Sequence, residues 1–218
     1  MLAKNINRIE LRATIPHVFE TEKIVSEVWR SDVSFERGQN YLIEAGSGTG
    51  KSSLCSYLYG SRNDFQGTIL FDGVDVRGFG INKWQQLRRT SIAYLPQELS
   101  LFPELTALQN VELKNNLTGY ASEKQIAEWF GELGISNRIH YPVGKMSIGQ
   151  QQRVAIIRAL CQPFSFLILD EPVSHLDDAN NEISANMIMR EVEKQGASVI
   201  ATSVGNNIKI EFNRVFRL

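Results

Sequence analysis

Residues 44–53, EAGSGTGKSS, form a glycine-rich turn between an apolar stretch and a helix-forming stretch. Gly46, Gly48 and Gly50 alternate along it, and a backbone without side chains can wrap an anion with its N–H groups. Apolar residues 41–43 predict a strand before the turn, and residues 53–59 predict a helix after it. Phosphate groups are therefore expected at the N-terminus of that helix, where free N–H groups and the helix dipole favour negative charge.

The turn matches the P-loop pattern G-x-x-x-x-G-K-S/T with one departure, Ala45 at the first position. In this pattern Lys51 reaches the β- and γ-phosphates of a nucleotide, and the Ser52 hydroxyl ligates Mg²⁺. The alternative is a glycine-rich turn that binds nothing, and the flanking strand and helix count against it. The predicted nucleotide-binding residues are Gly46, Ser47, Gly48, Thr49, Gly50, Lys51, Ser52 and Ser53.

Length and charge limit the kinds of protein that this chain can be. Its 218 residues suit one domain, and its net charge of −1 gives no basic field that indicates nucleic acid as a partner. Cys55 and Cys161 fall in expected helices, which favours core packing over a disulfide or a metal site. No apolar run has the length of a transmembrane helix, and residues 1–16 lack the apolar core of a signal peptide. We therefore expect a cytoplasmic protein that would need a partner for any role at a membrane.

The segments before residue 97 predict a largely antiparallel N-terminal part. Residues 8–14 alternate between apolar and polar and predict a half-exposed strand, and residues 24–29 and 33–35 are further strand candidates. A strand at 68–71 ends in the tight-turn pair Asp-Gly. A short basic helix at 82–90 and an apolar strand at 92–95 then follow.

The segments after residue 96 predict a helical lobe followed by buried strands. Residues 106–113 and 122–133 have helical spacing, and Ser147 with Gln150 forms a capping box for a helix through residue 160. Residues 164–169, FSFLIL, have the continuous apolar character of a strand buried on both faces. A helix at 180–195 and a buried strand at 197–202 complete an α/β pattern with a mostly parallel sheet.

Four further motifs follow the P-loop in a fixed order. They are Leu95-Pro96-Gln97 with Leu101-Phe102-Pro103, the run from Met146 to Ile156, Leu167 to Pro172, and Ser174-His175-Leu176-Asp177. Together with the P-loop they resemble the ATP-binding cassette (ABC) family, from about residue 33 to the C-terminus. The resemblance implies a P-loop NTPase core with an N-terminal antiparallel β subdomain and an inserted helical lobe. The whole chain, 1–218, would be one ABC ATPase domain, with 1–96 and 147–218 as the core and 97–146 as the lobe.

The resemblance also implies roles for residues around the nucleotide. Gln97 corresponds to the Q-loop glutamine, which senses Mg²⁺ and the attacking water. Asp170 corresponds to the aspartate that holds Mg²⁺ through water, and Glu171 to the residue that orients the hydrolytic water. The expected metal-site residues are Ser52, Gln97 and Asp170, and the expected catalytic residues are Glu171, Lys51, Gln97 and Ser203.

A second group of residues would act across a dimer. Ser147, Gly149 and Gln150 belong to the signature motif, which in this family binds the γ-phosphate held by a second subunit. A second helix N-terminus aimed at the phosphate adds positive potential there. Ser174 and Asp177 belong to the D-loop at the subunit contact. Two ATP molecules would be sandwiched between two copies, in a homodimer or a heterodimer.

The sequence departs from the family at two positions. Ile148 stands where the signature motif usually has its first glycine, which predicts weaker binding across the dimer. Ser203 stands where the family has its switch histidine, and a hydroxyl cannot supply imidazolium charge, so hydrolysis is expected to be slow. For the aromatic residue that stacks on adenine, Phe19 and Trp29 are candidates, although core packing is the favoured interpretation of both.

The function implied is that of an ATP-binding and ATP-hydrolysing subunit, with ATP and Mg²⁺ as cofactors. It would work as a head-to-tail dimer at the inner face of the cell membrane and drive a separate permease. The helix at 105–113 is similar to that of lipoprotein-release and macrolide-export ATPases. The alternatives are a nucleotide-gated dimerising clamp, favoured by Ser203, a small-molecule kinase that shares only the P-loop, and a soluble ABC protein acting on DNA or ribosomes.

Overall fold

Five strands form a parallel sheet, and four of them lead directly into residues singled out from the sequence. The computed structural model describes residues 5–218, so the first four residues of the N-terminal stretch lie outside the described part. In order across the sheet the strands are β6 (Ile92–Leu95), β7 (Phe166–Asp170), β8 (Ser198–Ser203), β3 (Tyr41–Glu44) and β9 (Arg214–Arg217). Every neighbouring pair is parallel. Because parallel strands place their carboxyl ends at one edge, the P-loop, Asp170 and Ser203 lie along the same edge.

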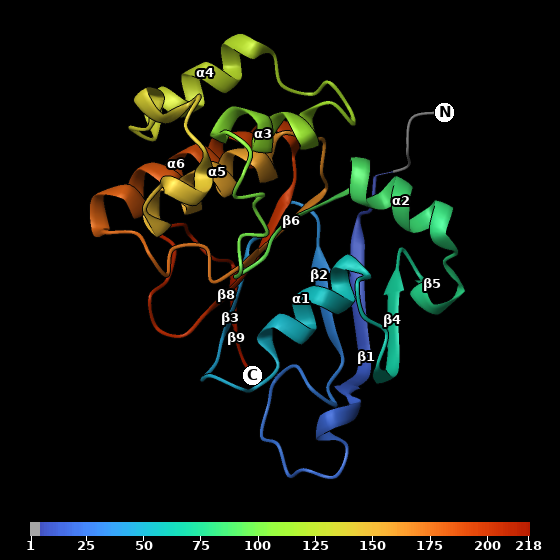
Figure 1. Ribbon diagram of the computed structural model, residues 1–218. Coiled ribbons are helices and arrows are strands. Elements are labelled where there is room, and N and C mark those ends of the chain that lie inside the picture. The colour runs from blue at the N-terminus through green and yellow to red at the C-terminus, as the bar shows by residue number, and fades with distance from the viewer. Residues whose placement is uncertain (1–4) are drawn as a thin grey trace.

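A second sheet forms the N-terminal part and is antiparallel (Figure 1). Its strands, in order, are β2 (Val33–Glu36), β1 (Arg8–Pro16), β4 (Phe65–Phe71) and β5 (Val74–Asp75). Helix α1 (Lys51–Tyr59) shares one apolar core with both sheets, which includes Leu54 of the helix, Ile9 of β1 and Ile168 of β7. The helix that follows the P-loop is therefore fixed between the two sheets.

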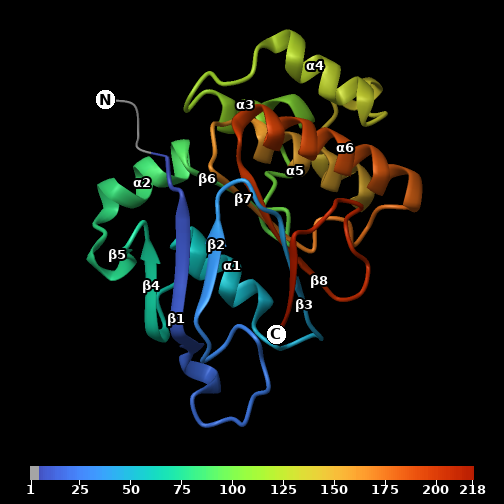
Figure 2. The same ribbon diagram turned by 180° about the vertical axis from the view of Figure 1, so that it is seen from behind.

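The remaining helices cover the other side of the parallel sheet. They are α3 (Ala107–Asn115), α4 (Glu123–Glu132), α5 (Ile148–Leu160) and α6 (Asp178–Gln195), while α2 (Ile81–Thr90) lies beside the antiparallel sheet. Seen from behind in Figure 2, α4 lies outermost above α5 and α6. Short 3₁₀ turns occur at η1 (His17–Phe19), η2 (Val76–Gly78), η3 (Ser136–Arg138) and η4 (Val143–Lys145). None of the helices within residues 5–218 combines the length and the apolar character needed to cross a membrane.

The fold class expected from the sequence is confirmed, including the parallel sheet and the antiparallel N-terminal part. The capping box of Ser147 and Gln150 is present at the start of α5, and both cysteines are buried in the core. The strand predicted at residues 24–29 is wrong, because this segment is an irregular loop. The Ser26 hydroxyl accepts the N–H groups of residues 28 and 29, so the segment turns instead of forming a strand ladder. Val25 is fully exposed, while Val28 and Trp29 are buried in the core.

Candidate functional site

Two aromatic side chains, Phe19 and Trp29, lie against the P-loop. Gly50, at φ 97°, is the N-cap of α1, and a Cβ at this position would lie only 2.9 Å from the ring of Phe19. The Trp29 indole N–H donates to the Thr49 carbonyl at 3.0 Å. Glycine at position 50 is therefore required both by the backbone conformation and by the close approach of the aromatic rings.

Lys51 and Glu171 face each other across the loop. The Lys51 ammonium is 5% exposed and donates to the carbonyls of Gly46 at 2.7 Å and Ala45 at 3.3 Å. Its Nζ lies 3.6 Å from Oε1 of Glu171. A buried cation and a carboxylate thus share the space enclosed by the glycine-rich turn.

A cavity of about 270 Å³ joins residues from four separate parts of the sequence. Gln97, which follows β6, and Glu171, which follows β7, line it together with the P-loop. Of the site residues predicted from the sequence, the structure therefore brings Gln97 and Glu171 to the P-loop. The full lining is Phe19, Ser47, Gly48, Gly50, Lys51, Ser52, Ser53, Gln97 and Glu171.

Thr202 connects Asp170 to Glu171. Asp170 is 1% exposed at the end of β7 and pairs in register with Thr202 at the end of β8. The Thr202 hydroxyl donates to Oδ1 of Asp170 at 2.7 Å and accepts the N–H of Glu171 at 3.1 Å. Glu171 adopts φ 50°, a left-handed conformation that costs a residue other than glycine about 1–2 kcal/mol. The hydrogen bond from its N–H to Thr202 helps to hold Glu171 in this conformation.

Sequence reasoning missed Thr202 and also Gln152. The Gln152 side chain donates to the carbonyls of Glu171 and Pro172 and accepts the N–H of His175 at 3.0 Å. It therefore links α5 to the chain that follows β7. The sequence held only weak signals for these two residues. Thr202 directly precedes Ser203, and Gln152 lies within the run from Met146 to Ile156, two residues after Gln150.

Ser203 lies beside the P-loop but does not line the cavity. It pairs with Glu44 at the end of β3, its carbonyl accepts the N–H of Ala45 at 3.1 Å, and its hydroxyl accepts the N–H of Gly205 at 3.0 Å. The side chain is 1% exposed. Ser203 thus stabilises the start of the P-loop through its backbone, while its hydroxyl is engaged with the chain after β8.

The signature-like residues meet the Ser174–Asp177 stretch at the surface. The Ser147 hydroxyl accepts the N–H of Gln150 at 3.3 Å, and the Gln150 side chain accepts the N–H of Ser147 at 3.1 Å. A Cβ at Gly149 would lie 2.8 Å from the carbonyl oxygen of His175, so only glycine allows this approach. None of these residues lines the P-loop cavity, and Ile148 is 48% exposed.

Asp177 caps helix α6 beside this surface. Its carboxylate accepts the N–H of Asn180 at 2.8 Å and also bonds the side chain of that residue. These hydrogen bonds hold the pKa of Asp177 below its usual value. Ser174 lies nearby, with its hydroxyl 3.0 Å from Nδ1 of His175. The Ser174–Asp177 turn is thus held by its own polar contacts and by the close approach of α5.

Three comparisons place these features among known proteins. The sequence profile of the family described as "ABC transporter" matches residues 29–174. The macrolide export ATP-binding/permease protein MacB of Wolinella succinogenes is 32% identical over 214 residues, which cover 96% of this chain but only 33% of MacB. The lipoprotein-releasing system ATP-binding protein LolD of Geobacter metallireducens is 30% identical over 190 residues, covering 86% of this chain and 84% of LolD.

A solved structure has the same fold as this chain. It is the dimeric structure of MJ0796, a bacterial ABC transporter cassette, which superimposes with a TM-score of 0.82. The match covers 96% of this chain and 94% of that one, at 24% sequence identity.

Proposed function

Because this chain belongs to the ABC transporter family, we propose that it binds and hydrolyses ATP as the nucleotide-binding subunit of a membrane transporter. The observation that carries the proposal is the cavity that gathers the P-loop, Gln97 and Glu171 around one space. Catalysis of phosphoryl transfer needs positioning and fixed charge more than covalent chemistry. This cavity offers backbone N–H groups, one buried ammonium and one carboxylate for those tasks.

Each side chain has a distinct part in the proposed reaction. The P-loop N–H groups and Lys51 bind and neutralise the phosphates, and the Glu171 carboxylate orients and polarises the attacking water. Thr202 keeps Asp170 and Glu171 in place through its two hydrogen bonds. The ammonium now bonded to Gly46 would turn to the phosphates when ATP enters.

The residues around the cavity fit Mg²⁺, which prefers hard oxygen ligands. A hydroxyl from Ser52, an amide oxygen from Gln97 and the buried carboxylate of Asp170 provide that chemistry. Ser52 and Gln97 line the cavity, and Asp170 immediately precedes Glu171. When bound, the ion neutralises charge on the β- and γ-phosphates.

Phe19 is the proposed adenine contact. It lines the cavity and is half-buried, so one face of its ring is available for stacking. Trp29 is 3% exposed and its indole N–H is bonded to Thr49. We therefore assign Trp29 to support of the P-loop and Phe19 to the nucleotide base.

A second copy or a related subunit completes the proposed site. Ser147, Gly149 and Gln150 surround a capped helix N-terminus at the surface, next to Ser174 and Asp177. In a head-to-tail dimer this helix would point at the γ-phosphate of ATP held by the partner. ABC cassette MJ0796 forms a dimer, and its fold matches this chain.

The proposed transporter includes a separate permease. The chain spans about a third of MacB, an ATP-binding/permease protein, and most of LolD, a separate ATP-binding protein, which supports a separate permease as the partner. In this proposal the chain is a peripheral protein on the cytoplasmic face of the membrane. Segment 97–146 would act as the lobe that responds to the permease, with 1–96 and 147–218 as the core. Pro96 and Gln97 are consecutive, yet Pro96 lines a cavity at the lobe junction and Gln97 lines the P-loop cavity. A movement of the lobe relative to the core at Pro96 would therefore displace Gln97 in the nucleotide cavity.

ATP turnover at increasing protein concentration tests this function, with Lys51→Ala as the blank. We expect a rate that rises faster than linearly, because each active site needs two copies. ATP binding with turnover no higher than the blank would instead favour the nucleotide-gated clamp. The buried Ser203, which cannot supply the charge of a histidine, is the observation that supports that second candidate.

A further inference from the structure

The side chain of Arg62 contacts the P-loop from outside the nucleotide cavity. Arg62 belongs to the loop 60–64, which connects α1 to β4. Its Nη1 donates to the Ser53 hydroxyl at 2.9 Å, and Ser53 lines the P-loop cavity whereas Arg62 does not. Ser53 therefore contacts a cation as well as the space proposed for the nucleotide.

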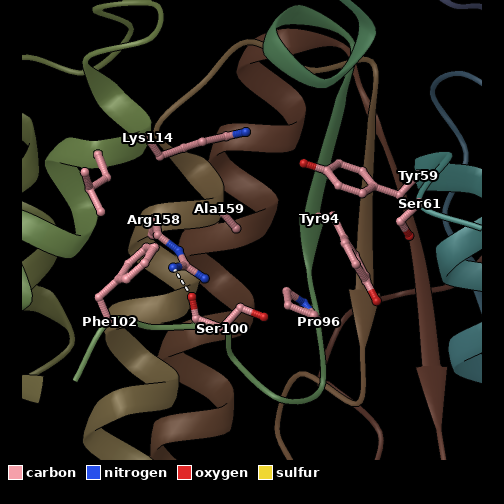
Figure 3. Close-up of a pocket in the computed structure, with 10 residues that line it drawn as sticks. Tyr59, Ser61, Tyr94, Pro96, Ser100, Phe102, Lys114, Arg158 and Ala159 are labelled. Carbon is pink, nitrogen blue, oxygen red and sulfur yellow. Dashed lines mark hydrogen bonds between the residues drawn. The ribbon is translucent and has the colours of Figure 1, made fainter. Parts of the chain in front are cut away.

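The loop 60–64 runs between two further cavities, and Ser61 lines both of them. The first, of about 350 Å³, lies at the junction of the core and the lobe (Figure 3). The second, of about 620 Å³, lies beside η2 and α2, and Arg62 lines this one only. A substitution of Arg62 therefore changes a side chain that lies outside the junction with the lobe.

Two neighbours, Asp64 and Tyr57, orient the guanidinium of Arg62. Its Nε donates to Oδ1 of Asp64 at 2.9 Å, and its Nη2 donates to Oδ2 of the same carboxylate. The guanidinium also lies over the ring of Tyr57, 5.5 Å from the ring centroid. Tyr57 is buried in α1, and its hydroxyl donates to the Asp64 carbonyl at 3.0 Å. The planar group is thus held so that Nη1 remains for Ser53.

The bond from Arg62 determines what the Ser53 hydroxyl can do. The hydrogen bonds from Arg62 lower the pKa of Asp64, so both partners of this pair are charged at neutral pH. A guanidinium only donates, so Oγ of Ser53 accepts in this bond and keeps its own proton for another acceptor. Tyr57 is a neighbouring acceptor in the free chain, and an anionic phosphate is the stronger one.

We propose that Arg62 is a positioning residue, which directs the Ser53 hydroxyl to a phosphate that ATP and ADP share. The inference rests on the proposed function, in which Lys51 and Ser52 already bind the β- and γ-phosphates and Mg²⁺. Ser53 is the third residue of α1, in the first turn, where free N–H groups face the phosphates. Because Asp64 neutralises Arg62, the contribution of Arg62 is orientation of the hydroxyl rather than net charge.

Titration calorimetry with ATP and with ADP tests the inference. Arg62→Gln should weaken the binding of both nucleotides about three- to tenfold, the usual net effect of one hydrogen bond. The loss should appear in Kd and KM but not in kcat, because ground state and transition state share this contact. Arg77→Gln is the matched control, since Arg77 lines the same 620 Å³ cavity and forms the same two-bond pair with Asp75. Its other side-chain bond goes to Thr68 instead of the P-loop, so its nucleotide affinity should match that of the unaltered chain.

A double-mutant cycle with Ser53→Ala shows whether Arg62 acts through the Ser53 hydroxyl. In the Ser53→Ala background, Arg62→Gln should cause no further loss of ATP affinity, because the hydroxyl that it orients is already absent. A merely structural effect of Arg62 on the P-loop would instead add to the effect of Ser53→Ala. Additive losses in the double variant would therefore overturn the inference.

Two further results would overturn the inference while leaving the proposed function intact. One is equal ATP affinity in the unaltered chain and Arg62→Gln. The other is a loss of affinity for ATP without a loss for ADP, which would place the contact at the γ-phosphate. Failure of the proposed function gives a different result, since the unaltered chain would then bind ATP no more tightly than Lys51→Ala.

Discussion

The Thr202 hydroxyl on β8 donates a hydrogen bond of 2.7 Å to Oδ1 of Asp170 on the neighbouring strand β7. The same oxygen accepts the N–H of Glu171, so the two proposed catalytic carboxylates share one buried hydroxyl. A hydroxyl has a single proton, and its donation to Asp170 fixes the direction of both bonds. Thr202 is therefore a positioning residue for the proposed Mg²⁺ ligand and the proposed base together.

Removing this hydroxyl tests that role. Thr202→Val keeps the shape but leaves two buried polar groups without a partner, and we expect a loss of about 1–3 kcal/mol in the free energy of unfolding. Turnover should fall about tenfold or more, with a higher Mg²⁺ requirement for nucleotide binding measured by calorimetry. Thr202→Ser restores the hydroxyl and should recover both. A purely structural role is indicated if Thr202→Val lowers stability alone and leaves the Mg²⁺ dependence unchanged.

Two properties of Glu171 can be tested separately, its role in turnover and the effect of its backbone conformation on stability. Glu171→Gln should lower turnover by about 10²- to 10⁴-fold, the usual contribution of a general base, while ATP binding survives. Because Glu171 holds φ 50°, Glu171→Gly should be about 1 kcal/mol more stable than Glu171→Ala by chemical denaturation. Glu128→Gln on the exposed face of α4 is the control and should leave turnover unchanged. Normal turnover in Glu171→Gln would remove this residue from the mechanism.

The motifs allowed the placement of the P-loop, Gln97 and Glu171 around one cavity to be predicted from sequence. The P-loop and Asp170-Glu171 are each short, and each follows a strand whose apolar character is strong, so the shared sheet edge could be foreseen. Gln97 follows β6 in the same way and lines the same cavity. What these motifs have in common is that their chemistry and their placement are encoded within a few consecutive residues.

Other contacts depend on residues far apart in the sequence and could not be predicted. Thr202 acquires its role from the register between β7 and β8, which no local pattern reveals. Arg88 on α2, Lys114 on α3 and Arg158 on α5 lie close together, although each of these residues alone resembles an ordinary helix surface cation in the sequence. The wrong strand prediction at residues 24–29 has a local cause instead. The Ser26 hydroxyl accepts two backbone N–H groups and forms a turn, although the apolar composition of the segment favoured a strand.

Gly149 allows the signature-like helix to contact the Ser174–Asp177 stretch. A methyl group at this position would meet the His175 carbonyl at 2.8 Å, so Gly149→Ala should cost about 1–3 kcal/mol of stability or push the two segments apart. We expect the rise of turnover with protein concentration to shift to higher concentration, because the proposed dimer contact is displaced. Gly78→Ala is the matched control, since a Cβ there meets nothing within 4 Å. Equal behaviour of the two variants would show that the contact does not matter for pairing.

The lowered pKa of Lys114 predicts how the free energy of unfolding changes with pH. Its pKa in the folded chain is about 8, below the ordinary 10.5, so the unfolded chain binds more protons between these values. The free energy of unfolding should therefore rise as the pH increases from about 8 to 10.5, because the cost of the buried charge is fully present below pH 8 and is relieved above it.

Tyrosines and cysteines also titrate in alkaline solution, so the informative quantity is the difference between two proteins. Urea unfolding of the unaltered chain and of Lys114→Gln should show the variant to be relatively more stable at pH 7.5, with the advantage shrinking toward pH 10. Lys124→Gln, at an 88% exposed position, should show no such trend. A difference that does not change with pH would mean that burial and the positive charges of Arg158 and Arg88 do not lower the pKa of Lys114.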